Sequence, residues 1–146
     1  MTIGFAGDHA GYLLAEPIGK YLASRGIQMK NFGTFGPESV DYPDFAHPLA
    51  EAVEKGEVDA GIAACGTGNG MAMSLNKHRG IRAGLVWNTD IARLVKEHNN
   101  ANVLVLPQRF IPEQEALECV RTWLDTGFAG GRHQRRIDKI ALQDPR

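Results

Sequence analysis

Short apolar runs alternate with longer amphipathic segments along the chain. Such alternation is typical of successive β-strand and α-helix units that form a parallel sheet covered by helices. We expect strands at residues 2–6, 27–32, 60–64, 81–86 and 102–106, and helices at 11–24, 45–55, 70–76, 89–97, 112–124 and 134–142. The pattern therefore predicts an α/β fold, a Rossmann-like three-layer αβα sandwich with a five-stranded parallel sheet.

The composition fits one domain over residues 1–146. Hydrophobic residues make up 43% of the chain and charged residues 23%, which supports a single core, and no low-complexity linker interrupts the pattern. The net charge of −1 gives no general attraction for nucleic acid or an anionic membrane, so neither is expected as a partner. The first residues lack the features of a secretory signal, and no apolar run is long enough to span a bilayer. We therefore expect a cytoplasmic protein.

Residues suited to chemistry follow three of the predicted strands. In an open parallel sheet, the ligand site lies beyond the carboxyl ends of the strands. Asp8 and His9 follow the first strand, and Cys65 follows the third. Arg109 follows the fifth strand, so all four residues are expected at one edge. His98 follows a helix instead and is expected at the opposite edge, so a second subunit would have to bring it to the same site.

The segment Cys65-Gly66-Thr67-Gly68-Asn69-Gly70 is the most informative part of the chain. Its glycines let the backbone turn tightly with N–H groups pointing inward at the start of a helix, which suits a phosphate or a developing oxyanion. One interpretation is a dinucleotide-binding loop, although the glycine spacing and the position after the third strand disagree with it. A plain structural turn is another. A catalytic thiol facing an oxyanion site accounts for both the cysteine and the glycines, whereas Cys119 lies in a helical apolar pattern typical of a core.

Asp8 and His9 supply a carboxylate and an imidazole at a strand end, where side chains are expected to face the ligand. The five histidines and two cysteines show no spacing typical of a metal site, so neither a metal nor another cofactor is expected. A thiol hydrolase with Cys65 as nucleophile and His98 as base is an alternative, because the sequence does not show whether these side chains touch.

Seven short segments are spread in order from residue 3 to about residue 140. They are Gly7-Asp8-His9-Ala10-Gly11, Asp41-Tyr42-Pro43, Cys65-Gly66-Thr67-Gly68-Asn69-Gly70, Asn76-Lys77, Gly80-Ile81-Arg82-Ala83, Glu97-His98-Asn99-Asn100-Ala101-Asn102 and Gly131-Arg132-His133-Gln134-Arg135-Arg136-Ile137. Together they resemble the type B ribose-5-phosphate isomerases. These belong to a wider family of sugar-phosphate isomerases, which includes allose-6-phosphate and galactose-6-phosphate isomerases.

The resemblance implies an aldose–ketose isomerase that works through an enediolate without a cofactor. Cys65 matches the base that takes the C2 proton, and Thr67 matches the hydroxyl that helps a proton to move between O1 and O2. Asp8 and His98 match residues that open the sugar ring. The remaining matches are the anion-hole residues Gly66, Gly68, Asn69 and Gly70, the sugar contacts Tyr42 and Asn99, and the phosphate contacts His9, Arg109, Arg132 and Arg136. The resemblance also implies a homodimer or tetramer with shared sites, in which residues 128–146 pack on the partner subunit.

Three positions depart from the family pattern. Met71 stands where members without the cysteine carry a glutamate base, so Cys65 has no substitute in this chain. Ala72 replaces a common serine, and Leu75 replaces a usual alanine. These departures leave the sugar open, so another aldose phosphate, such as allose 6-phosphate, galactose 6-phosphate or a tetrose phosphate, is the alternative substrate. A sugar-phosphate-binding module without catalysis is the alternative from another class.

Overall fold

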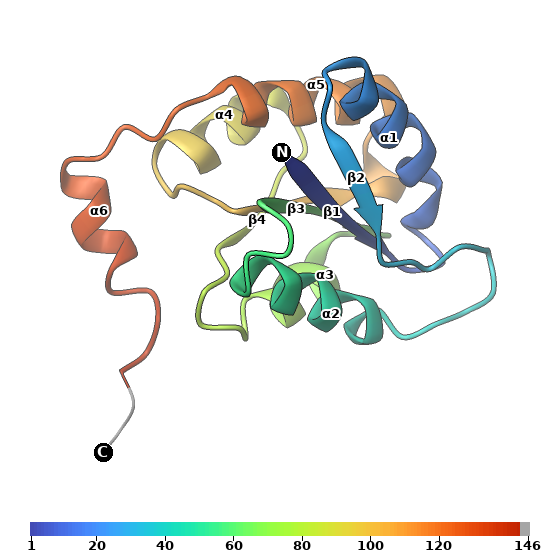
Figure 1. Ribbon diagram of the computed structural model, residues 1–146, viewed down its shortest axis with the longest axis horizontal. Helices are drawn as coiled ribbons and strands as arrows, with labels where there is room; N and C mark the ends of the chain where they lie inside the picture. The colour runs from blue at the N-terminus through green and yellow to red at the C-terminus, as the bar shows by residue number, and fades with distance from the viewer. Residues whose placement is uncertain (144–146) are drawn as a thin grey trace.

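A five-stranded parallel sheet forms the centre of the computed structural model, which describes residues 1–143 (Figure 1). The strands lie side by side in the order β2-β1-β3-β5-β4. Their bounds are Thr2–Gly7 (β1), Gln28–Asn31 (β2), Ala60–Cys65 (β3), Ala83–Leu85 (β4) and Val103–Pro107 (β5). The three inner strands β1, β3 and β5 are buried on both faces, which explains their nearly continuous apolar sequences. The predicted fold class is confirmed.

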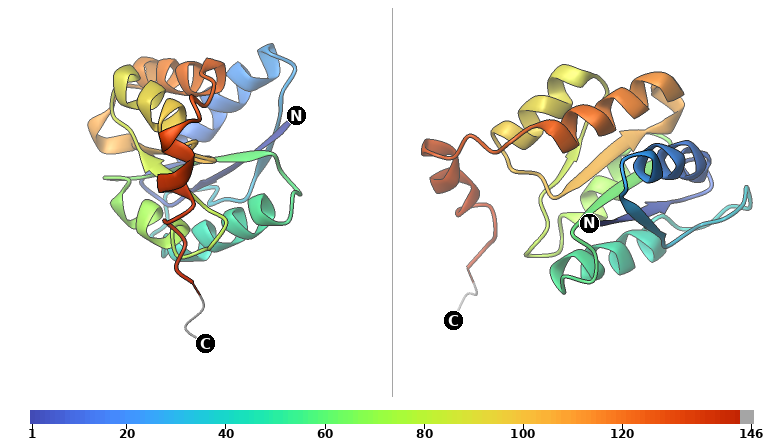
Figure 2. Two further views of the ribbon diagram at one scale, coloured as in Figure 1. Left: turned by 90° about the vertical axis from the view of Figure 1, so that its left-hand side faces the viewer. Right: turned by 45° about the horizontal axis from the view of Figure 1, so that its top comes forward.

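Helices cover both faces of the sheet (Figures 1 and 2). One face packs against α1 (Ala15–Ser24), α4 (Thr89–Glu97) and α5 (Glu113–Asp125), and the other against α2 (Pro43–Glu54) and α3 (Asn69–Leu75). Two short 3-10 turns, η1 (Tyr12–Leu14) and η2 (Gln108–Phe110), follow β1 and β5. Each face therefore has its own apolar core, and the loops at the sheet edges are left to form a site.

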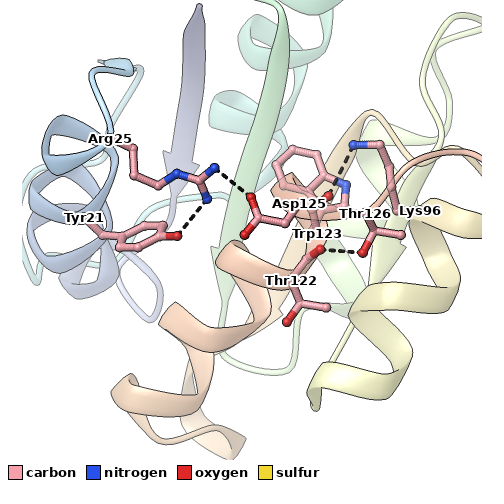
Figure 3. A network of polar contacts seen from close by, with 7 residues as sticks. All are labelled: Tyr21, Arg25, Lys96, Thr122, Trp123, Asp125 and Thr126. Carbon is pink, nitrogen blue, oxygen red and sulfur yellow. Dashed lines mark hydrogen bonds and ion pairs between the residues drawn. The ribbon is translucent and has the colours of Figure 1, made fainter.

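Polar contacts join the ends of α1, α4 and α5 on one face of the sheet (Figure 3). Arg25 donates hydrogen bonds to the Tyr21 hydroxyl at 3.0 Å and to the Asp125 carboxylate at 2.7 Å. Lys96 donates to the Trp123 carbonyl at 3.3 Å and lies over the indole ring, 4.9 Å from its centroid. Burial in this contact lowers the pKa of Lys96. The carboxyl end of α4 is thus held firmly on α5.

The last helix differs from its prediction. We expected residues 134–142, but the observed helix α6 spans Arg132–Ile137. Gly130 and Gly131 precede it with positive φ angles, and none of its residues is buried. A helix without an apolar face packed on a core gains little from extending further.

The segment that carries α6, here called the C-terminal arm (residues 128–143), projects from the rest of the molecule. Figure 2 shows α6 standing apart from the helical layers, joined to α5 by an extended connection. The predicted partner-contacting segment, residues 128–146, includes this arm, while its residues 144–146 lie outside those the structure describes. Within residues 1–143, no helix has the length and apolar character needed to cross a membrane.

Candidate active site

Cys65 is the last residue of β3, and the glycine loop (residues 66–70) leads from it into α3. Gly68 has a φ of 80°, in the left-handed region that favours glycine, and a β-carbon there would collide with Leu85. The N–H groups of Thr67 and Gly68 have no acceptor within residues 1–143. Cys65 is 5% exposed. The fold therefore places a nearly buried thiol beside backbone N–H groups that are available to an anion.

The turn after β1 packs directly on the end of β3. Gly11 lies so close to Ala64 that a β-carbon on Gly11 would overlap the Ala64 carbonyl group, and the N–H of Asp8 donates to that carbonyl at 3.4 Å. The Asp8 side chain is only 5% exposed, although it lines a hollow beside the turn. Its Oδ1 accepts a hydrogen bond from the Ala10 N–H at 2.8 Å, so the carboxylate also stabilises the turn.

A hollow of about 460 Å³ opens beside this turn. It is lined by Asp8 and His9 and by the connection that leads to α2. The His9 Nδ1 accepts a hydrogen bond from the Val40 N–H at 3.1 Å, which orients the imidazole. Tyr42 lines the same hollow, and its ring lies against Gly70, where a β-carbon would be 2.5 Å from the ring. The hollow therefore adjoins the glycine loop.

Arg109 contacts the glycine loop from η2. Its N–H donates to the Gly66 carbonyl at 3.1 Å, and its guanidinium would lie 3.3 Å from a β-carbon on Gly66. Thr67 and Asn69 are exposed at the mouth of the loop, where the Thr67 hydroxyl accepts the Asn69 N–H at 3.3 Å. The structure thus gathers most of the predicted site residues at the carboxyl edge of the sheet, namely Asp8, His9, Tyr42, Cys65, Gly66, Thr67, Gly68, Asn69, Gly70 and Arg109.

A second group lies where α4 ends. His98, Asn99 and Arg136 line a hollow of about 370 Å³ between α4 and the C-terminal arm. The His98 ring stacks on that of His133, with centroids 4.4 Å apart and planes 13° from parallel. Burial lowers the pKa of His133, and the charges of His98, Arg132 and Arg136 lower it further. The sequence did not identify His133 as a site residue, because no local pattern pairs two rings so far apart in the chain.

The two groups of residues are not brought together within one chain. Cys65 ends a strand, whereas His98 ends the helix that leads back to the start of β5, so they lie at opposite edges of the sheet. Within one chain, the thiol-hydrolase alternative, which requires these side chains to touch, has no support from their positions. Arg132 and Arg136 are exposed on α6, where a spacing of four residues puts them on one helical face.

Cys119 belongs to the core, as its sequence context predicts. Its side chain is fully buried under α5, and this burial, with Glu115 and Glu118 nearby, raises the pKa of the thiol to about 11. Within the described residues 1–143, no three His, Cys, Asp or Glu side chains are grouped so that they could hold a metal ion.

Comparison with known proteins gives one consistent result. The family model described as Ribose/Galactose Isomerase matches residues 3–140. Ribose-5-phosphate isomerase B of Escherichia coli is 40% identical to this chain, over 99% of the chain and 97% of the relative. The crystal structure of a ribose 5-phosphate isomerase from Thermotoga maritima superposes with a TM-score of 0.93 at 48% identity, covering 96% and 97% of the two chains. The structure of ribose-5-phosphate isomerase B from Mycoplasma genitalium with bound ribulose-5-phosphate superposes with a TM-score of 0.91 at 42% identity, covering 95% and 93%.

Proposed function

Because the chain belongs to the ribose/galactose isomerase family, we propose that it interconverts ribose 5-phosphate and ribulose 5-phosphate, with Cys65 as the base. One observation supports the proposal: Cys65 ends β3 where the glycine loop begins, and the β1 turn and Tyr42, which form a hollow, pack on the two ends of that segment. A relative that is 42% identical has been crystallised with ribulose-5-phosphate. A binding module without catalysis would need the glycine backbone but not the thiol.

The proposed reaction moves one proton between neighbouring carbons. The Cys65 thiolate removes the proton from C2 of the open-chain aldose, and the electrons of that C–H bond form an enediolate with charge on O1. N–H groups of the glycine loop hold this charge, as an oxyanion site does. Thr67 assists the transfer of a proton from O2 to O1, and the thiol then returns its proton to C1, which leaves the ketose. These steps need no redox change and no cofactor.

Ring opening and phosphate binding are assigned to the other predicted residues. Asp8 and His98 exchange protons with the ring oxygen and the O1 hydroxyl of the cyclic sugar, while Tyr42 and Asn99 contact its hydroxyl groups. His9, Arg109, Arg132 and Arg136 bind the phosphate, where guanidinium groups form charge-assisted hydrogen bonds. Binding energy at this remote group orients C1 and C2 against Cys65.

A complete site then requires two chains. His98, Asn99, Arg132 and Arg136 lie on the side of the chain that faces away from its own Cys65, and α6 has no buried residue of its own. We propose a homodimer, alone or within a tetramer, in which residues 128–146 pack on the partner subunit. In this arrangement, the end of α4 and the C-terminal arm of one chain complete the site around Cys65 of the other.

A substrate panel tests the assignment. The purified protein is assayed for aldose–ketose exchange with ribose 5-phosphate, allose 6-phosphate, galactose 6-phosphate and a tetrose phosphate. We expect the highest kcat/KM with ribose 5-phosphate. A higher value with a hexose or tetrose phosphate would assign the chain to another branch of the family, and no exchange with any of them would leave a binding module as the better interpretation.

A further inference from the structure

The turn after α4 ends the helix with a residue in the left-handed region. Asn100 has a φ of 46°, and it is the one non-glycine residue within residues 1–143 with a positive φ. Its N–H donates to the Lys96 carbonyl at 3.0 Å, and the N–H of Ala101 donates to the Val95 carbonyl at 3.1 Å. Asparagine is one of the few residues other than glycine that adopt this conformation, and many helices end with a left-handed residue whose N–H donates to the carbonyl four positions earlier. This turn directly follows His98 and Asn99.

Arg82 holds this turn from the side of β4. Its Nε and Nη2 both donate to the Asn100 carbonyl, at 3.1 and 2.9 Å. The backbone adds two further contacts, because the Arg82 N–H donates to the Asn102 side-chain oxygen at 2.8 Å and its carbonyl accepts the Asn102 N–H at 3.1 Å. Trp123 holds the turn from the side of α5, where its Nε1 donates to the Ala101 carbonyl at 3.0 Å. The turn is thus fixed between two layers.

The arginine is poorly suited to a merely structural role here. Burial lowers the pKa of Arg82, and within residues 1–143 no carboxylate forms an ion pair with it. A half-buried guanidinium therefore directs two donors at a single carbonyl, although a neutral side chain could cap that carbonyl at lower cost of desolvation. Arg82 also lines a hollow of about 400 Å³ together with Asn99, so it borders the residues whose backbone it fixes.

We propose that Arg82 is a positioning residue that sets His98 and Asn99 for the reaction, by holding the Asn100 carbonyl. It does not touch the substrate in this scheme. The backbone bonds form the left-handed turn, the guanidinium fixes the direction of the Asn100 carbonyl within it, and the His98 ring is thereby kept on His133, 4.4 Å away. This inference rests on the proposed function, because it gives Arg82 its effect through the ring-opening histidine.

A double-mutant cycle tests this role. The variants are Arg82→Met, His98→Ala and the two combined, with kcat and KM measured for ribose 5-phosphate. We expect Arg82→Met to lower kcat by roughly 10- to 150-fold, the loss that corresponds to one charge-assisted hydrogen bond. Because Arg82 acts through His98, the combined variant should be no more than about twofold worse than His98→Ala alone. Arg82→Lys, which keeps a positively charged donor group, should recover most of the activity.

Arg79→Met is the matched control. Arg79 is an exposed arginine on the same loop, and its side chain forms no hydrogen bond within residues 1–143. We expect its kcat to equal that of the wild type. Circular dichroism shows whether each variant folds, and Arg82→Lys provides the comparison if Arg82→Met does not. Full kcat in a folded Arg82→Met protein, or losses that simply multiply in the double variant, would overturn the inference.

A readout that needs no activity separates this inference from the proposed function. The ring protons of His98 and His133 report their stacking by nuclear magnetic resonance. Arg82→Met should shift both sets of resonances, and Arg79→Met should shift neither. If the wild type isomerises none of the sugars in the panel, the proposed function fails while this spectroscopic result still decides whether Arg82 positions His98. Unchanged His98 resonances in Arg82→Met would contradict the positioning role.

Discussion

The glycine loop and the C-terminal arm are built in opposite ways, although both are assigned to the same reaction. The loop lies inside the domain, where the Leu85 side chain leaves no room for a β-carbon on Gly68, and the adjoining Ala64 backbone leaves none on Gly11. The arm extends from the domain, and its helix α6 buries none of its residues. In the proposed site, the C2 proton transfer therefore uses residues of one chain, whereas ring opening by His98 and phosphate binding by Arg132 and Arg136 depend on assembly.

Substitutions in the glycine loop and in the C-terminal arm should therefore affect different kinetic constants. A change at the loop alters chemistry that one chain contains, so it should lower kcat at any protein concentration. A change on the arm alters how the substrate is held by the partner subunit, so it should act mainly on KM.

The largest expected effect is at Cys65. Cys65→Ala removes the proposed base. It should lower kcat by about 10²- to 10⁴-fold, the range that a general base typically contributes. The affinity for a non-reacting phosphate ligand should stay close to the wild-type value, because the thiol acts on carbon and not on the phosphate. Steady-state kinetics and calorimetric titration measure the two quantities.

Cys119→Ala is the control for this substitution. Cys119 is buried in the core, with the pKa of its thiol raised to about 11, so its loss should reduce thermal stability and leave kcat nearly unchanged. Near-normal turnover in Cys65→Ala would exclude Cys65 as the base and would remove the chemical contrast between the loop and the arm.

The next effect is at the arginines of the arm. Arg132→Ala or Arg136→Ala should weaken binding of the sugar phosphate by about 2–5 kcal/mol, the range for removing one partner of a buried charged pair. This corresponds to a rise in KM of roughly 30-fold to several thousand-fold. Arg135→Ala is the matched control, since Arg135 lies on a different face of the same short helix. Equal effects at Arg135 and Arg136 would indicate general charge attraction rather than a phosphate site.

Mixing two variants tests whether the glycine loop and the C-terminal arm of one site come from different chains, and its expected effect is smaller. Cys65→Ala and His98→Ala proteins, each strongly impaired, are mixed under conditions that exchange subunits. Half of the dimers are then mixed, and each mixed dimer has one site with both residues intact, so about one quarter of the wild-type activity should return. No recovery despite exchange proven by native mass spectrometry would mean that one chain builds the whole site.

The sequence predicted the loop region better than the arm. The carboxyl ends of parallel strands meet at one edge, so the positions of Cys65, Arg109 and the β1 turn follow from the strand order along the chain. The helix at 89–97 matched its predicted bounds, because Asn88 caps it with a side-chain oxygen that accepts the Ile91 N–H at 2.9 Å.

Contacts between distant side chains were not predicted. The stacking of His98 on His133, the bonds from Arg82 to Asn100 and the 2.7 Å contact between His47 and His78 each join separate elements. They depend on how helices and loops pack, which no local pattern records. The short helix α6 was misplaced for a related reason, since its ends are not fixed by an apolar face.

The smallest expected effect is a change in the titration of His133. Burial beside the stacked His98 ring lowers its pKa, and the charges of Arg132 and Arg136 lower it further, so its midpoint should lie below the ordinary value of about 6.5. The His133 imidazole is then protonated less readily in the folded chain than in the unfolded chain. The stability that this contact gives to the arm should be complete above about pH 6.5 and should be lost as the pH falls toward the folded-state pKa.

Nuclear magnetic resonance titration of the His133 ring protons measures this midpoint. Arg136→Ala removes one of the positive charges and should raise the midpoint toward the ordinary value, whereas Arg121→Ala, at an exposed position on α5, should leave it unchanged. A midpoint above the ordinary value in the wild type would mean that an acidic group, such as Glu97, dominates the surroundings of His133 and that the arm is held by an ion pair.

Because Arg136 is also a proposed phosphate ligand, adding a phosphate ligand should partly offset its charge and raise the same midpoint. The titration of His133 would then report whether phosphate is bound at the arm. The glycine loop contains no histidine that could report binding in the same way.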